Sequence, residues 1–126
     1  MLIVFANNQT MAADGAAGGT ASVITTDPVP LNGNDRASMI LNAHYFFGGG
    51  GAVNRSFSVQ PQVSNDGVVF LNTGAAITIT AAGDTPLQIV RTVNGAYLRM
   101  QYTLSVTPVQ PNAHICFDHH VNLDHV

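Results

Sequence analysis

Apolar and polar residues alternate one by one along much of this chain. The clearest case is 96–106, where Leu98, Met100, Tyr102, Leu104 and Val106 alternate with Arg99, Gln101, Thr103 and Ser105. A period of two places successive side chains on opposite faces of a strand, whereas a helix would mix the two sets. Segment 55–63 repeats the pattern, and the last such segment has Ile115, Phe117, His119, Val121 and Leu123 on one side. These three segments are predicted to be half-buried β-strands.

Shorter segments rich in β-branched or aromatic residues predict further strands at 1–5, 22–26, 38–47, 68–71, 76–80 and 87–92. The first is expected to end at the polar residues 7–9. Turn residues that tolerate positive φ separate the strands, at 32–35, 65–67, 82–84 and 94–95. We therefore predict an all-β fold, an antiparallel β-sandwich or jelly roll of about eight strands. The 126 residues are expected to form a single domain over 1–126, with 1–21 as an N-terminal strand and arm.

The composition is unusually poor in charge. Charged residues make up 9% of the chain, with no Lys, no Glu and a formal net charge of −3. Nucleic acid is not an expected partner, because phosphate binding needs clustered Lys and Arg and the four arginines are scattered. The apolar start is too short for a membrane span, so no membrane partner is expected either. A polar, uncharged surface suits a protein that is largely covered by partners.

Two segments of small residues interrupt the strand pattern and are our predicted partner contacts. They comprise Asp14, Gly15, Gly18 and Gly19 in the first segment, and Gly48, Gly49, Gly50 and Gly51 in the second. Four consecutive glycines cannot form a strand interior, so 48–51 is predicted to be a flexible loop. A phosphate-binding loop would need a following helix and a nearby Lys, and the sequence offers neither.

The C-terminal segment contains the one cluster of potential metal ligands. On a strand, His114, Cys116, Asp118 and His120 share a face and are candidate ligands. Side chains two residues apart on a strand are about 7 Å apart, so a metal would need ligands from a second strand. His44 is the one histidine elsewhere. We expect no metal and no cofactor here, but a polar outer face or a subunit contact that the histidines could make pH-dependent.

No catalytic residues are predicted. The chain has no Gly-x-Ser-x-Gly elbow and no evident carboxylate pair, and its single cysteine, Cys116, lies mid-strand. The protein is therefore expected not to be an enzyme. A metal-dependent enzyme of the cupin type is a third hypothesis, and it requires histidines from more than one strand.

From Phe57 onward the chain resembles small β-sandwich proteins of tailed-bacteriophage virions, and also discoidin-like and carbohydrate-binding sandwiches. The matching pieces are Ser64-Asn65-Asp66-Gly67 followed by Val68-Val69-Phe70, then Thr78 to Thr80 with Ala81-Ala82-Gly83, then Gly95-Ala96-Tyr97-Leu98-Arg99-Met100. The resemblance covers somewhat over half of the chain. Discoidin-like members commonly carry Trp where Phe70 stands, and we find no set of exposed aromatic residues of the kind that their ligand loops use.

The resemblance implies a virion structural protein, a capsid decoration (cement) protein on the capsid surface. Its expected partners are the major capsid protein and copies of itself, in a homo-oligomer such as a trimer. It would stabilise the phage head by bridging major capsid proteins. The alternatives are a carbohydrate-binding or adhesive module, or another phage part such as a tail or connector protein.

Overall fold

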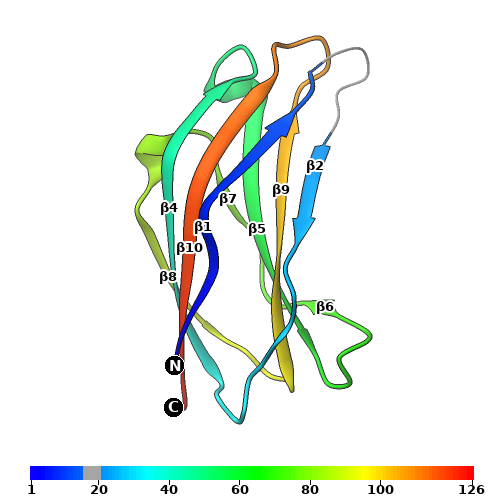
Figure 1. Ribbon diagram of the computed structural model, residues 1–126, viewed down its shortest axis with the longest axis vertical. Coiled ribbons are helices and arrows are strands. Elements are labelled where there is room, and N and C mark those ends of the chain that lie inside the picture. Colours follow the sequence, from blue (N-terminus) through cyan, green and yellow to red (C-terminus); the bar gives the residue numbers. More distant parts are fainter. Residues whose placement is uncertain (16–20) are drawn as a thin grey trace.

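The computed structural model describes residues 1–15 and 21–126, and Figure 1 shows these folded into two facing β-sheets. Sheet A contains, in spatial order, β1 (Leu2–Ala13), β10 (Ala113–Asp124), β4 (Arg36–Gly48) and β8 (Leu87–Thr92). Sheet B contains β2 (Ala21–Thr25), β9 (Tyr97–Val106), β5 (Arg55–Ser64) and β6 (Leu71–Asn72), with β3 (Val29–Pro30) paired to β9 and β7 (Ile77–Ile79) paired to β5. Two short 3-10 helices are present, η1 (Ala52–Asn54) and η2 (Ala82–Asp84).

The predicted fold class is confirmed, because the strand pairs between these elements are antiparallel and the two sheets form a sandwich. Ten strands are present in the described residues, against about eight predicted, since β3 and β6 are only two residues long. No helix in the described part of the chain is long and apolar enough to cross a membrane.

The core lies between the sheets and is made by the alternating side chains. Every second residue of β9 is buried, from Leu98 to Val106. An aromatic cluster occupies the centre, where the rings of Phe57 and Phe117 are 4.6 Å apart and those of Tyr102 and Phe117 are 4.9 Å apart. Large side chains of this kind bury the most apolar area per residue, so this cluster is a main source of stability.

β1 is longer than predicted. It continues through Asn7, Asn8 and Gln9 to Ala13, because its backbone pairs with β10 along nearly its whole length. The polar stretch is accommodated by β-bulges, which shift the register between Val4 and Ala6 and again between Ala6 and Gln9. Asn8 takes the positive φ of 50° that one bulge requires, a conformation that Asn tolerates better than most residues.

The predicted strand over 68–71 is mostly wrong. Only Leu71 belongs to a strand, and Val68 and Val69 lie in a loop. The cause is Asp66, whose Oδ1 accepts hydrogen bonds from the N–H groups of Val68 (2.8 Å) and Val69 (2.9 Å). These donors are therefore unavailable to a sheet, despite the high β-propensity of valine.

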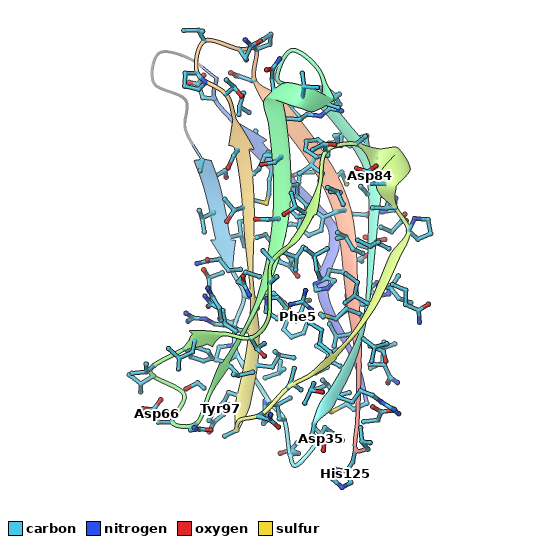
Figure 2. The ribbon with its side chains drawn as sticks, turned by 180° about the vertical axis from the view of Figure 1, so that it is seen from behind. Phe5, Asp35, Asp66, Asp84, Tyr97 and His125 are labelled. Carbon is cyan, nitrogen blue, oxygen red and sulfur yellow. The ribbon has the colours of Figure 1, made fainter. Side chains whose placement is uncertain are left out.

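The two ends of the sandwich differ. The chain termini lie side by side at one end (Figure 1), where the Met1 amino group donates to the Leu123 carbonyl oxygen at 2.7 Å. Asp35 and His125 also lie at this end (Figure 2), with Nδ1 of His125 at 3.5 Å from Oδ2 of Asp35. The opposite end carries the connections that follow β4 and β9.

Candidate functional site

Those predicted contact residues that the structure describes gather at the end of the sandwich away from the termini. We call this region the loop end and define it as residues 14–15, 48–54 and 107–112. Asn112 connects its three parts, because its carbonyl oxygen accepts a hydrogen bond from Gly49 N–H (3.3 Å) and its Oδ1 accepts one from Gly15 N–H (3.3 Å). The structure therefore brings the two predicted segments together through a third segment that the sequence did not single out. Gly18 and Gly19 lie outside the described residues.

The glycines of the loop end allow close backbone packing. A Cβ at Gly48 would overlap the carbonyl oxygen of Asn112, and a Cβ at Gly15 would overlap that of Gln110. Gly48 ends β4 with a φ of +89°, which confirms that the glycine run is not a strand interior. Arg55 closes the base of the loop, because its Nη1 donates to the Gly48 carbonyl oxygen at 3.0 Å.

Two aliphatic side chains form the tips of the loop end. Val53 is 91% exposed and Val109 is 78% exposed. Val109 also has a φ of +62°, which is an outlier for a β-branched residue. The adjoining turn holds this backbone in place, with Gln110 N–H donating to the Thr107 carbonyl oxygen at 3.3 Å and Thr107 N–H donating to that of Asn54 at 2.8 Å.

The second predicted cluster lies on the outer face of sheet A, which we define as the side that faces away from sheet B. His114, Asp118 and His120 are partly exposed there, whereas Ile115, Phe117 and the other predicted inward residues of β10 are buried. Cys116 belongs to the same outward row but is itself buried, opposite Thr10 of β1 and Tyr45 of β4. It thus behaves as a small filler on this face rather than as an open ligand.

Asp118 is held between two bulged strands. Its Oδ1 accepts a hydrogen bond from the N–H of Asn8 in the β1 bulge at 2.6 Å, and its Oδ2 lies 2.9 Å from Nε2 of His44. The hydrogen bond from Asn8, with a smaller effect from His44, holds the pKa of the Asp118 carboxyl below its ordinary value. His44 lies at the β4 bulge, where the register with β10 shifts between Cys116 and Phe117.

Sequence reasoning did not foresee the partnership of His44 with Asp118. These residues are 74 positions apart, and no local pattern links them. The pairing does bring a histidine from a second strand to the cluster. Even so, among the residues that the structure describes, no group of three or more His, Cys, Asp or Glu side chains is arranged to hold a metal ion.

The same face carries a strip of exposed aromatic rings on β4 and β10, a place that the expectation about ligand loops did not cover. The rings of Tyr45 and Phe47 on β4 are 5.3 Å apart, and Phe47 stacks on His114 of β10 at 5.1 Å. Tyr45 is 40% exposed and Phe47 is 53% exposed. The run Tyr45-Phe46-Phe47 was a sequence signal for exposed aromatic rings. In a regular strand, however, the neighbours His44 and Tyr45 would point to opposite faces. The β4 bulge places both side chains on the outer face.

A half-open cavity of about 480 Å³ lies farther along this face. Its lining combines apolar and hydrogen-bonding side chains, namely Ile40, Asn42, Pro86, Asp118 and His120. Asp118 therefore borders the cavity and also contacts His44, the neighbour of Tyr45. Such a mixture of apolar walls and a few polar groups is typical of small-molecule sites.

Comparison with known proteins finds similarity in fold and none in sequence family. No known protein family matches this sequence, and no curated protein matches it either. A structure of infectious bursal disease virus, Gx strain, aligns with a TM-score of 0.56 and 10% identity over 96% of this chain and 30% of that chain. The VP2 subviral particle of the same virus aligns with a TM-score of 0.56 and 11% identity, over 99% of this chain and 32% of that one.

A carbohydrate-binding module specific for non-crystalline cellulose, CBM28, aligns with a TM-score of 0.49 and 8% identity, over 99% of this chain and 82% of that chain. This chain spans about a third of the length of the two viral chains. At these identities the viral likeness shows a shared β-sandwich fold.

Proposed function

We propose that this protein is a non-catalytic structural protein of a virus particle and that it docks on the particle through its loop end. The observation that carries this proposal is the pair of exposed aliphatic tips, Val53 and Val109, at one end of the sandwich. Val109 keeps a left-handed backbone that costs a valine about 1–2 kcal/mol. A strained residue that presents an apolar side chain to solvent is typical of a contact site.

The surface chemistry supports assembly. With charged residues at 9% of the chain and no Lys or Glu, the protein has little charge repulsion to keep copies apart. Contacts that are repeated by symmetry add up, so each docking contact can be small. The shared fold with proteins of a virus particle is consistent with this role.

The finer form of the proposal is a capsid decoration protein of a tailed phage. In this form the loop end contacts the major capsid protein, and copies of the chain, in a homo-oligomer such as a trimer, bridge neighbouring capsid subunits on the virion surface. The mechanism is mechanical, because buried interface area resists the internal pressure of the packaged genome. Asp14, Gly15 and Gly48–Gly51 would shape the backbone of the contact, and the two valines would supply its apolar area.

Particle docking is the direct test. Particles purified from the source that carry this protein are stripped of it, and purified chain is added back and quantified by co-sedimentation and electron microscopy. We expect the wild-type protein to rebind and Val53→Asp and Val109→Asp each to bind at least about tenfold more weakly, since each buries a charge in an apolar contact.

Val68→Asp is the matched control. Val68 is 80% exposed and follows Asp66 at the opposite end of the sandwich (Figure 2), so its variant should bind like the wild type. Absence of the chain from purified particles, or equal rebinding of all three variants, would refute docking through the loop end. Density on a tail or a connector, in place of the capsid, would refute the decoration role alone.

A further inference from the structure

The outer face of sheet A has the features of a ligand site that is separate from the loop tips. β1, β10 and β4 run side by side across it (Figure 1). The aromatic strip of Tyr45, Phe47 and His114 lies on one side of the bulges, and the 480 Å³ cavity lies on the other. The two are joined by the pair of His44 and Asp118.

The bulges distinguish this region from a plain sheet surface. β1 and β4 are both irregular beside the same stretch of β10, at Cys116 to His119. Asp118 anchors both irregularities through Asn8 and His44. Bulges are found disproportionately next to functional sites, because they re-aim side chains that a regular strand would alternate.

The chemistry of the face selects the class of ligand. The aromatic strip offers flat apolar area to C–H groups, and Asn42, Asp118 and His120 offer hydrogen-bonding atoms at the cavity. Arg36 is bound by Asp124 (2.6 Å), and the Asp118 carboxylate lies beside His44 (2.9 Å). A phosphorylated or otherwise strongly anionic ligand would meet no unpaired cation cluster there.

We propose that the aromatic strip and the adjoining cavity together bind an uncharged saccharide. A sugar ring has the matching chemistry, since one face presents C–H groups and its rim presents hydroxyl groups that both donate and accept hydrogen bonds. In the cavity, Ile40 and Pro86 would contact the C–H groups of a ring and the polar lining residues its hydroxyl groups, and the strip would extend the contact to further sugar units. The protein would thereby attach a particle to a glycan-coated surface, a function beyond docking.

The test is a glycan microarray probed with the purified full chain. The array carries neutral hexose, deoxyhexose and N-acetylhexosamine oligosaccharides beside sialylated, sulfated and uronic-acid ones. We expect binding to neutral glycans only. A bound oligosaccharide is then titrated in solution while the NMR signals of Tyr45, Phe47 and His120 are followed, and these signals should shift.

Two variants and one control locate the site. Phe47→Ala removes aromatic area and Asn42→Ala removes a cavity donor and acceptor, and each should weaken binding at least about tenfold. Leu71→Ala truncates an exposed apolar side chain on sheet B and should bind like the wild type. Asp118 is left unchanged, since its removal would release both bulges.

Three results would overturn the proposal. One is a lack of binding to every neutral glycan at millimolar concentration. Another is unchanged affinity in both Phe47→Ala and Asn42→Ala. The third is a loss of particle docking in Phe47→Ala with no loss of glycan binding, which would assign the face to a protein partner. Val53→Asp should keep glycan binding, so failure of the particle proposal and failure of this one are distinguishable.

Discussion

His119 is a buried polar residue in an aromatic environment. Its side chain is fully buried, with Nδ1 at 2.8 Å from the Tyr102 hydroxyl oxygen and with the rings of Phe5 and Tyr102 at 6.2 Å and 5.7 Å; Figure 2 shows Phe5 between the two sheets. Nε2 has no hydrogen-bond partner within the residues that the structure describes. Whichever nitrogen carries the proton, one buried polar atom remains unsatisfied, at a cost of about 1–3 kcal/mol.

The buried environment of His119 predicts that the protein is less stable in acid. Burial, with a smaller effect from His120, lowers the pKa of His119 to about 4 from the model-compound value of 6.5. Above pH 6.5 the imidazole is neutral in both the folded and the unfolded state and contributes no pH dependence. Between pH 6.5 and 4 only the unfolded chain takes up the proton, so the free energy of unfolding should fall by roughly 3 kcal/mol. Chemical denaturation at a series of pH values measures this fall.

His119→Gln removes the titrating group while it keeps hydrogen-bonding atoms near Tyr102. Its free energy of unfolding should vary less between pH 6.5 and 4 than that of the wild type. His125→Gln alters an exposed histidine beside Asp35 and should retain most of the wild-type fall. Parallel pH profiles for the wild type and His119→Gln would show that another group is responsible.

At the scale of elements, the connection 107–112 combines a strained backbone with the contact role proposed above. Its turn places Val109 at a φ of +62° with the side chain in solvent. The exposed side chain adds little packing energy to offset the strain of this backbone conformation. A loss of folding stability at one exposed position is often found where selection has favoured binding.

Val109→Asn should therefore stabilise the protein. Asn tolerates the left-handed region, and relief of the strain should raise the free energy of unfolding by about 1 kcal/mol. Denaturation in urea measures the change. Val68→Asn is the control, because Val68 is similarly exposed without a positive φ, and it should give no comparable gain. A loss of stability in Val109→Asn would mean that the valine makes a favourable contact within the loop.

At the scale of the whole molecule, the C-terminal strand organises sheet A. β10 lies between β1 and β4 and pairs with both along nearly its whole length. Four of its apolar side chains, Ile115, Phe117, Val121 and Leu123, are almost completely buried. At about 1.5–3 kcal/mol each, they contribute on the order of 6–12 kcal/mol, which is comparable to the whole stability of a small protein.

A chain that ends at Asn112 should therefore not fold. Circular dichroism and the dispersion of NMR signals would show an unfolded or aggregated state. A chain that ends at Asp124 lacks only the last two residues, which follow β10, and should fold like the wild type with a small loss of stability. A native-like spectrum for the shorter chain would mean that β1 and β4 can pair without β10.

Local patterns account for much of what could be predicted. The period of two in 96–106 and in the C-terminal segment predicted both the strands and their buried sides, including the inward position of His119, because alternation is a property of the strand itself. Pairing between distant segments has no such signal. The bulge at Asn8 was therefore missed. The loop at Asp66 was missed for a local reason, because the prediction followed the β-propensity of Val68 and Val69 and overlooked the hydrogen bonds that the Asp66 carboxylate accepts from their N–H groups.

The sequence by itself determined the all-β class, the position of most strands and the scarcity of charge, since these follow from side-chain period, turn residues and composition. The tertiary structure alone decided which distant residues meet at the loop end and on the outer face of sheet A. Asn112 binds both Gly49 and Gly15, the latter 97 positions away, and Asp118 joins Asn8 to His44. Such sites depend on strand order and register, which are set by the packing of the whole core and not by any one segment.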